Sequence, residues 1–396
     1  MQKCHTIHRA DHILEDYLKE TFEGLTPEEL TELIKTHKIR CPKCKGELET
    51  AGILNLMFPI TLGTETKSYL RPETAQGVYV NFSRMFEVTR KQLPLGLAII
   101  GKAYRNEISP RQLLIRMREF TQAELQIFFD PSRINEHENW GEVKNYKLLM
   151  LPASNRKEII ELTCEDVVKK LKLPKFYVYH LAKTQQFFLD KLKIDKKSFR
   201  FKELSEEEKA FYNKIHWDIE LNLESIGWKE MGGVHYRTDH DLSGHAKVSK
   251  KSAEIFFENK KLVPHVLELS FGIDRILFSL LDISFVKEKE RSFLRLPASI
   301  SPFFVAVFPL VNKDGIDEKA KEVYDNLKIK FDVFFDNSGS IGKMYSRADE
   351  IGTAFCITCD YDTLKDNSVT VRQRDTKKQD RVKIKDLEKF ISNLLE

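Results

Sequence analysis

Two segments near position 100 have the residue pattern of neighbouring β-strands. Residues 97–105 (LAIIGKAYR) are rich in β-prone side chains, and apolar and polar positions alternate over much of 118–129 (REFTQAELQIFF). Both features are typical of strands. Because segment 106–117 between them is polar, we predict a long antiparallel hairpin with a mobile tip.

Further along the chain, a strand pattern passes abruptly into a helix pattern. Residues 266–271 (VLELSF) read as a buried strand, and in 272–282 apolar residues recur at helical spacing, at Ile273, Ile276, Leu277, Leu280 and Leu281. Residues from about 130 to 223 look like an insertion richer in helix, in which Ser205 and Glu208 would form a capping box that opens a short helix. We therefore predict an antiparallel sheet with flanking helices, an α+β fold.

The pattern changes near 296–302 (LPASISP), where we place a domain boundary between 1–298 and 299–396. After it, β-prone runs alternate with amphipathic segments, as in a small α/β domain. The expected strands are 303–308, 330–335, 353–359 and 369–373. One expected helix carries Ile316, Ala320, Val323 and Leu327 on one face, and the last carries Ile384, Leu387, Ile391 and Leu394.

Composition narrows the class of protein. The chain has 396 residues, 41% hydrophobic and 31% charged, with a net charge of +4, as in an ordinary globular protein of two or three domains. Its longest apolar run, 303–311, is far shorter than the roughly 18 residues of a membrane helix. No apolar stretch follows the basic residues at the start, so we expect a cytoplasmic protein. The small net charge does not by itself indicate nucleic-acid binding.

The predicted hairpin carries many charged and aromatic side chains around its tip. They are Arg105, Asn106, Glu107, Arg116, Arg118 and Phe120. Arginine on a rigid strand binds phosphate or carboxylate through two hydrogen bonds, a glutamate accepts from an adenine amino group, and an aromatic ring stacks on a purine. Taken alone, the same residues also fit a salt-bridged ribbon exposed to solvent.

Two further segments add an arginine and an acid. Arg275 lies in the first turn of the predicted helix, where backbone N–H groups favour anions. In 69–82 (YLRPETAQGVYVNF), the Arg-Pro-Glu-Thr string predicts an extended turn that holds Glu73 before a helix. No GxxxxGK[ST] phosphate loop is present. The three segments together suit attack of a carboxylate on the α-phosphate of ATP, for which the protein positions charges and supplies no nucleophile.

Five strings in order resemble the archaeal and eukaryotic type of glycyl-tRNA synthetase, a family of class II aminoacyl-tRNA synthetases. They are YLRPETAQG, RNEISPR with IRMREFTQAE, GWKEMGGVHYRTDHDLSGHA, LELSFGIDRIL and SGSIGKMYSRADEIG. The resemblance runs from about Arg9 to the C-terminus. It implies a class II antiparallel-sheet catalytic domain with a helical insertion, followed by an α/β anticodon-binding domain. It also implies ATP and Mg²⁺ as cofactors, glycine and tRNA(Gly) as substrates, and a homodimer without membrane attachment.

The resemblance further implies roles for individual residues at the nucleotide. Arg105, Arg275 and Glu268 are the implied catalytic residues. Arg105 would contact the α-phosphate and the glycine carboxylate, and Arg275 the γ-phosphate. Glu107 would accept from the adenine, with Phe120 stacked on it. The other implied ATP-binding residues are Asn106, Arg116, Met117, Glu230 and Met231, and Glu230 and Glu268 would lie nearest the magnesium.

For glycine, the positions implied by the family are Glu73, Glu124, Arg237, Glu268 and Ser270. Several carboxylates around one ammonium group favour its charged form, and packing against the glycine Cα leaves no room for a methyl group. Because one methylene is worth only about 1–3 kcal/mol in an apolar pocket, steric exclusion has to supply most of the selectivity. The alternative is that these glutamates are unrelated surface acids.

Two of the six cysteines, Cys41 and Cys44, form a CxxC turn of the zinc-knuckle type, which needs further ligands. Candidate ligands upstream are Cys4, His5 and His8. Archaeal family members have a cysteine where this chain has Met1. Two interpretations are compatible with this pattern. One is zinc held by Cys4, Cys41 and Cys44 in a knuckle spanning about 4–46, and the other is a reduced pair in an inert turn.

The C-terminal domain resembles the anticodon-binding domain of the same class. Its candidate RNA contacts are Lys343, Arg347, Arg372 and Arg374. The chain departs from the family in one respect: the segment called motif 1, a helix and strand that build the dimer interface, is missing ahead of HRADH. Three explanations account for the missing segment: a misassigned start, a fragment, or a separate polypeptide that supplies motif 1. We expect the chain alone to dimerise poorly and to activate glycine weakly.

Two other classes of protein compete with this interpretation. A non-catalytic relative, such as a polymerase accessory subunit, would keep the fold and bind nucleic acid, but it would lose the arginines that bind ATP. A synthetase of the same subclass for another small amino acid would keep them. The presence of Arg105, Glu107, Arg116 and Arg275 therefore favours an enzyme.

Overall fold

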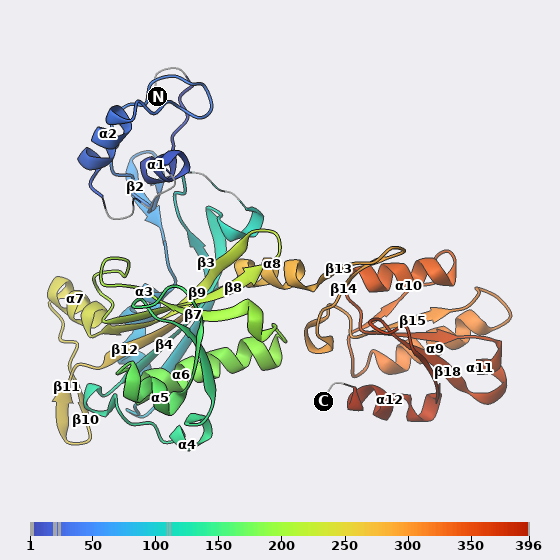
Figure 1. Cartoon of the computed structure of the whole chain (residues 1–396). Coiled ribbons are helices and arrows are strands. Elements are labelled where there is room, and N and C mark those ends of the chain that lie inside the picture. The colour runs from blue at the N-terminus through green and yellow to red at the C-terminus, as the bar shows by residue number, and fades with distance from the viewer. Residues whose placement is uncertain (1–3, 19–21, 23–24, 109, 111, 395–396) are drawn as a thin grey trace. The chain divides into compact units, whose positions relative to one another are not determined.

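The computed structural model describes residues 4–18, 22, 25–108, 110 and 112–394 (Figure 1). The chain forms two compact units. The first comprises the described residues up to Gln185 with Phe199–Asn222 and Trp228–Phe278, and the second comprises Gln186–Ser198, Leu223–Gly227 and the described residues from Ser279 onward. Because these units interleave in sequence, the division at 298 stays a prediction. Met1 lies outside the described residues, and none of the described helices is long and apolar enough to cross a membrane.

The first unit is built on an eight-stranded sheet (Figure 1). In spatial order its strands are β3 (Leu95–Tyr104), β4 (Glu119–Phe129), β12 (His265–Gly272), β9 (Gly227–Thr238), β8 (Ile215–Leu223), β7 (Phe199–Glu203), β5 (Lys147–Leu151) and β6 (Ile160–Thr163). Strands β3 and β4 pair antiparallel from Leu95↔Phe128 to Tyr104↔Glu119, so the predicted hairpin is confirmed. Strand β12 pairs antiparallel with β4 on one side and with β9 on the other.

Helices and short hairpins complete this part of the chain. The helices are α1 (Ala10–Leu18), α2 (Pro27–Thr36), α3 (Ala75–Val88), α4 (Trp140–Val143), α5 (Cys164–Lys170), α6 (Lys175–Gln186), α7 (His240–Ser249) and α8 (Ile273–Ser284). The hairpins join β1 (Phe58–Leu62) to β2 (Thr66–Leu70), and β10 (Ile255–Phe257) to β11 (Lys260–Leu262). Strand β12 passes directly into α8, which confirms the predicted strand-to-helix junction.

Helix α3 packs on the sheet through an apolar face that follows the helical repeat. Val78, Tyr79, Phe82 and Phe86 on this helix are all buried. The ring of Phe82 stacks on that of Phe128 from β4, with 4.2 Å between centroids. This contact packs the middle of α3 against the C-terminal end of β4.

The segment 130–223 differs from its prediction, because it supplies four strands of the main sheet as well as α4, α5 and α6. Strand β7 (FRFKE) was missed because its outward positions are charged. Phe199 and Phe201 are fully buried, while Arg200 forms an ion pair with Glu220 of β8. The pattern of alternation is therefore present, but it is short and easily mistaken for a charged loop.

The short helix predicted at Ser205 is also absent. Both capping bonds form, from Ser205 N to Glu208 Oε2 (2.8 Å) and from Glu208 N to Ser205 Oγ (3.3 Å). The chain nevertheless makes only turns at 206–212. A single turn without a packed apolar face does not offset the entropy cost of helix nucleation.

The second unit contains a five-stranded mixed sheet. Its strands are, in order, β16 (Val333–Phe335), β15 (Val305–Pro309), β17 (Phe355–Cys359), β18 (Ser368–Gln373) and β19 (Gln379–Lys383). Strand β15 pairs parallel with β16 and β17, whereas β18 pairs antiparallel with β17 and β19. The helices are α9 (Ile316–Leu327), α10 (Ile341–Glu350), α11 (Tyr361–Asp366) and α12 (Ile384–Asn393), and a hairpin of β13 (Phe285–Lys287) and β14 (Ser292–Leu294) precedes the sheet.

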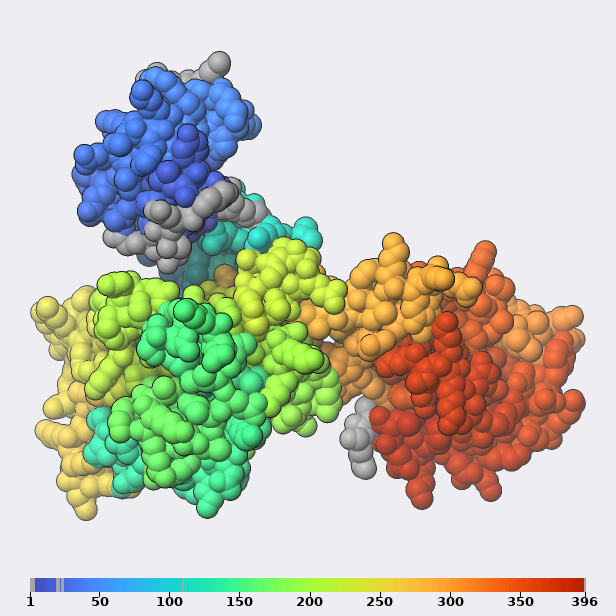
Figure 2. Space-filling model, viewed as in Figure 1, coloured from blue at the N-terminus to red at the C-terminus, as the bar shows by residue number. Residues whose placement is uncertain are grey.

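This arrangement confirms the predicted small α/β domain. The four apolar residues expected on one face of α9 are all buried, in a core that also contains residues of β15, β16, β17 and β18. Figure 2 shows the outer surface of the second unit from one side, with residues 305–394 in orange to red. Elements α10, α11 and β19 were not predicted; β19 (QDRVK) has a single apolar residue, and α10 begins in a Gly-Ser string.

We predict that Phe128→Ala destabilises the first unit by about 3–5 kcal/mol, because the substitution removes a fully buried ring and leaves a cavity under α3. Urea unfolding followed by circular dichroism measures this change. The matched control is Phe256→Ala on β10, whose side chain is 59% exposed and whose loss should cost less than about 0.5 kcal/mol. Equal effects of the two substitutions would contradict the assigned core.

Candidate active site

The hairpin loop and the turn before α3 meet at Arg105. Arg105 Nε donates to Pro72 O at 3.2 Å, and its guanidinium lies over the ring of Phe120, 5.2 Å from the centroid. Across the loop, Arg118 Nε donates to Glu107 O at 3.0 Å. These bonds use backbone oxygens as acceptors, so the arginines are oriented without losing their charge to a carboxylate.

Arg275, in the first turn of α8, ties three elements together. Its Nε donates to Ile115 O at 3.0 Å and its Nη1 donates to Glu230 O at 3.1 Å. Nη1 also lies 3.2 Å from the Glu230 carboxylate, whose side chain is half exposed. The hairpin loop, β9 and α8 therefore hold one guanidinium at the mouth of the site.

A second group of side chains lies in the middle of the sheet. Ser270 of β12 is directly opposite Glu124 of β4 and Gly233 of β9. Glu124 is buried, accepts from Thr74 Oγ1 at 2.6 Å and accepts from Ser270 Oγ at 3.4 Å. Thr74 thus bonds to Glu124 rather than capping α3, and Glu73 stands beside it at the helix N-terminus.

Buried charges surround Arg237 of β9. Its Nε and Nη2 donate to the two carboxylate oxygens of Asp241, at 2.7 and 2.8 Å, and its Nη1 donates to Glu268 Oε2 at 3.1 Å. Gln126 Nε2 also donates to Glu268 Oε2, at 2.8 Å. All four side chains are at most 8% exposed, so strands β4, β12 and β9 and helix α7 are joined by charge-assisted bonds.

The ionisation of these groups is set by burial and by one another. Burial, with a smaller contribution from Glu268, raises the pKa of Glu124 to about 7. Burial also raises the pKa of Glu268, although Arg237 opposes this shift. Burial alone would lower the pKa of Arg237, but Glu268 and Asp241 raise it overall. The carboxylate end of the site therefore needs a cation to be fully ionised near neutral pH.

Strand β12 leads from the buried carboxylate of Glu268 toward α8, which carries Arg275. From Glu268 to Gly272, just before α8, is four residues of β12. At about 3.3 Å per residue this is about 13 Å, which matches an amino acid followed by a phosphate chain.

One cavity collects nearly all the predicted site residues. Glu73, Arg105, Glu107, Arg116, Met117, Phe120, Glu124, Glu230, Met231, Arg237, Glu268, Ser270 and Arg275 line it, and Asn106 does not. Asn106 instead bonds through its backbone N–H to Leu56 O at 2.8 Å and through its side chain to Asn55 O at 3.4 Å. Its predicted place at the nucleotide is therefore not seen in this arrangement.

The same cavity contains residues that the sequence did not single out. They are Leu114, Ile115, Thr121, Gln122, Tyr212, Gly232, Gly233, His235, Gly272 and Asp274. The polar residues Gln122, Glu124 and Gln126 alternate along β4, and this row was a usable signal, because polar residues rarely alternate on the buried face of a strand.

His235 is a part-buried polar residue next to Glu268, directly opposite it on the neighbouring strand. Its Nε2 lies 3.7 Å from Glu268 Oε1, and Asn213 lies 3.2 Å from its Nδ1. Burial, then His216 and Arg237, holds its pKa well below the usual range, so the imidazole is neutral. His235, His240 and His245 are spaced five residues apart in the sequence, and the metal-type cluster found among the described residues contains none of them.

Two glycines of β9 form part of the cavity wall. A Cβ atom on Gly232 would lie 2.0 Å from the backbone oxygen of Ser270, and one on Gly233 would lie 2.7 Å from His235 Nε2. No side chain fits at Gly232 without moving β12, so the wall at this point consists of main chain.

The N-terminal cysteines come together as predicted. The Sγ atoms of Cys4, Cys41 and Cys44 all lie within 4.8 Å of one another, and Cys41 is fully buried. Cys44 N lies 3.4 Å from Cys41 Sγ, in the N–H···S geometry of a knuckle turn. Three soft sulfur donors at this separation suit zinc.

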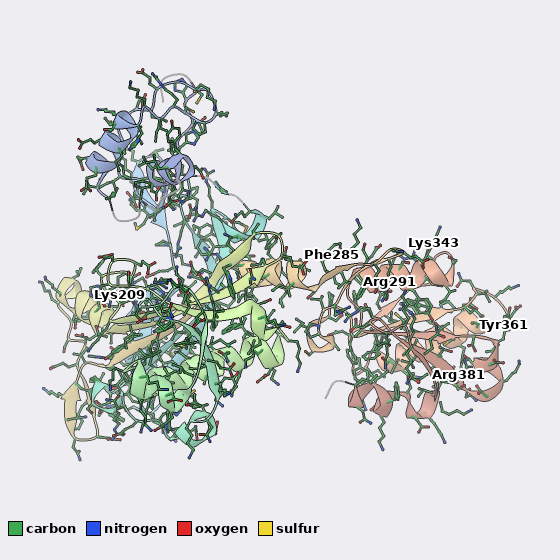
Figure 3. All side chains as sticks on the ribbon, viewed as in Figure 1. Lys209, Phe285, Arg291, Lys343, Tyr361 and Arg381 are labelled. Carbon is green, nitrogen blue, oxygen red and sulfur yellow. The ribbon has the colours of Figure 1, made fainter. Side chains whose placement is uncertain are left out.

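The candidate RNA contacts in the second unit differ in exposure. Lys343 is exposed on α10 (Figure 3), and Arg347 is part-exposed but pairs with Asp336 at 2.6 Å. Arg372 and Arg374 are 6% and 4% exposed. Arg372 forms a bidentate pair with Asp349, at 2.9 and 3.0 Å, and Arg374 donates to Gly352 O and Leu296 O. We correct the prediction for Arg372 and Arg374, since both guanidiniums are used inside the domain.

Comparison with known proteins places the fold and the site in one class. Residues 61–284 match the tRNA synthetase class II core domain (G, H, P, S and T), and residues 304–394 match the anticodon binding domain. A prolyl-tRNA synthetase from Cryptosporidium parvum, solved with halofuginone and AMPPNP, has the same fold at 18% identity, with a TM-score of 0.59 over 87% of this chain and 62% of that chain. The fold and the site are those of a class II aminoacyl-tRNA synthetase, which confirms the α+β prediction.

Relatives identify the family within this class. Glycine–tRNA ligases from Thermococcus gammatolerans and Pyrococcus furiosus are 39% and 38% identical to the whole chain, which covers 84% of each. That of Methanocaldococcus jannaschii is 36% identical, again over the whole chain and 84% of the relative. The chain belongs to the glycine–tRNA ligase family, as the five sequence strings indicated.

We predict that glycine binds more tightly as pH rises through 7. Glu124, with its pKa raised to about 7, is mostly neutral at pH 6 and mostly ionised at pH 8, and only the ionised form attracts an ammonium group. The dissociation constant for glycine should fall about tenfold between these pH values. Isothermal titration calorimetry measures it, and Glu124→Gln should bind weakly with no such pH dependence. An affinity of the unsubstituted chain that is equal at pH 6 and 8 would refute this assignment.

Proposed function

We propose that the chain activates glycine with ATP to form glycyl-adenylate and diphosphate, and then transfers glycine to the 3′ end of tRNA(Gly). One observation carries this proposal. A single cavity is lined both by buried carboxylates and by Arg105 and Arg275, and about 13 Å of β12 separates Glu268 from the strand end that precedes the helix of Arg275. An amino group, a carboxylate and a polyphosphate in this order fit that charge pattern.

The residues would position the reactants rather than react. A glycine carboxylate oxygen attacks the α-phosphorus, and the bond to the leaving diphosphate breaks. Arg105, beside Phe120, is placed to neutralise charge on the α-phosphate, and Arg275 is placed to hold the outer phosphates. In the second step a ribose hydroxyl of tRNA attacks the glycyl carbonyl carbon, and AMP leaves with the electron pair of the broken bond.

Magnesium enters this scheme with ATP, as a part of the substrate. Glu230 is half exposed beside Arg275, so it is the carboxylate that we assign to the metal. Glu268 was the other candidate, but it is buried and accepts from Gln126 and Arg237. We therefore place Glu268 with Glu73 and Glu124 around the glycine ammonium, and Ser270 beside them.

Selectivity for glycine would come from the cavity wall. A larger amino acid needs room for a methyl group at its Cα, and the wall at Gly232 is main chain in close contact with β12. Because backbone moves less readily than a side chain, this wall would exclude larger amino acids by its shape.

Three further parts of the proposal concern partners and place. We propose that Cys4, Cys41 and Cys44 bind zinc and that the active form is a homodimer, with a polypeptide that supplies motif 1 as the alternative partner. Strand β3 lies at the edge of the eight-stranded sheet and carries Ile100, which is 73% exposed, so it offers a surface to another chain. A part in protein synthesis would place the chain in the cytoplasm. Sedimentation of the purified chain tests the dimer.

The activity is tested by ATP–diphosphate exchange with glycine, alanine and serine as separate substrates. We expect exchange with glycine alone, and exchange with alanine or serine at an equal rate would contradict the proposal. Arg275→Ala should lower glycine-dependent exchange by about 10²–10³-fold, because it removes one preorganised donor to the transition state. The control is Arg133→Ala, an exposed arginine paired with Glu258 away from the cavity lining, which should leave the rate unchanged.

Recognition of tRNA is tested in the second unit by two substitutions with opposite expectations. Lys343→Ala should raise the KM for tRNA several-fold, leaving diphosphate exchange intact, because a phosphate contact is lost without a change in the fold. Arg372→Ala should instead destabilise the unit by about 3–5 kcal/mol, since it breaks a buried ion pair. Aminoacylation kinetics and thermal unfolding measure the two effects. An unchanged KM in the Lys343 variant would remove this residue from the RNA surface.

A further inference from the structure

A histidine lies beside the cysteine cluster at the N-terminus. Cys4 Sγ is 3.9 Å from Cys41 Sγ, and His8 Nε2 is 3.6 Å from the same Cys41 Sγ. We propose that His8 is the fourth ligand of a zinc ion held by Cys4, Cys41 and Cys44, so that the site is a Cys₃His site. This inference rests on the zinc part of the proposed function and adds the residue that completes the coordination.

The two distances agree with the edges of a tetrahedral zinc site. With Zn–S bonds of about 2.3 Å and a Zn–N bond of about 2.0–2.1 Å, sulfur atoms lie about 3.8 Å apart, and sulfur and nitrogen about 3.6 Å apart. The observed separations are 3.9 and 3.6 Å. Closing the tetrahedron brings the imidazole of His8 toward the other two sulfur atoms, around the position that the three thiols already surround.

The backbone around Cys41 supports a thiolate at this position. Cys41 N donates to Gly46 O and Lys45 N donates to Cys41 O, both at 2.9 Å, and Lys45 has a φ of 57° in the left-handed region. The turn thereby aims Cys44 N at Cys41 Sγ. Because Cys41 is fully buried, its negative charge requires a cation close by.

Among the candidate ligands near the three cysteines, His8 is the one that can complete the zinc coordination. A zinc site with four protein ligands is closed, and the three cysteines leave one position open. Cys4 and His8 are separated by three residues, within the spacing of ligand pairs on one loop. Met1 has no thiol, and His5 is exposed whereas His8 is part-buried.

A metal also fits the small size of the local core. Among the described residues near the cysteines, the buried apolar core consists of Ile13, Leu14, Ile34 and Ile39. A core of this size gains much of its stability from a cross-link such as zinc. On binding, the three thiols release their protons to solvent, and neutral His8 donates the lone pair of Nε2, so the site carries a net charge of −1.

The experiment uses the full chain, first as purified with zinc and then after exchange of zinc for Co²⁺ alone. We expect one zinc per chain, and X-ray absorption with three sulfur neighbours and one imidazole nitrogen. His8→Ala should weaken zinc binding by more than about 100-fold in chelator competition, beyond the 10–100-fold typical of outer-shell partners. His5→Asn, the matched control, should bind zinc as the unsubstituted chain does.

His8→Cys keeps the result interpretable where the alanine variant fails to fold. It should hold one Co²⁺ with stronger sulfur-to-cobalt absorption and bands shifted to longer wavelength, as a fourth thiolate replaces the imidazole. Unchanged cobalt spectra in both His8 variants, with metal still bound, would overturn the role of His8 and leave a three-cysteine site. A purified chain with neither zinc nor stoichiometric cobalt would overturn the zinc proposal itself.

Discussion

The catalytic cavity depends on a guanidinium that is buried between two carboxylates. Arg237 pairs with Asp241 and Glu268 in the interior, where unpaired charge is very costly. The pairing binds β9, β12 and α7 into one rigid group. Glu124 lies beside the same cluster, and burial, with a smaller contribution from Glu268, raises its pKa to about 7. In the proposed function, the ammonium group of glycine would lie among these charges.

At the other end of β12 the same residue type is used differently. Arg275 donates to the backbone oxygens of Ile115 and Glu230, and Arg105 donates to that of Pro72. A carbonyl fixes a guanidinium in direction but does not neutralise it. Arg275 also pairs with the Glu230 carboxylate, which is half exposed and which we propose as the magnesium ligand.

Most of this architecture was predictable from the sequence where pattern and packing agree. The β3–β4 hairpin and the β12–α8 junction have strong periodicity and were predicted correctly. Strand β7 was not predicted, because the charged residues Arg200 and Lys202 alternate with its two buried phenylalanines and resemble a charged loop. Arg372 looked like an RNA contact for a related reason. A sequence shows that a side chain is basic, but only the fold shows that the Arg372 guanidinium is paired with Asp349. The environment of His235 could not be read from the sequence, because it depends on a cross-strand neighbour 33 residues away, Glu268.

The contact between Gly232 and Ser270 has a consequence for protein engineering. Binding pockets are usually widened by trimming a bulky side chain, yet Gly232 has none to trim, and a main-chain oxygen of β12 occupies the place where its Cβ would lie. Any side chain introduced at this position would have to move two hydrogen-bonded strands apart, and doing so would disturb the register that brings Ser270 opposite Glu124. In the proposed function, a change of substrate range at this wall would therefore also be a change of sheet geometry.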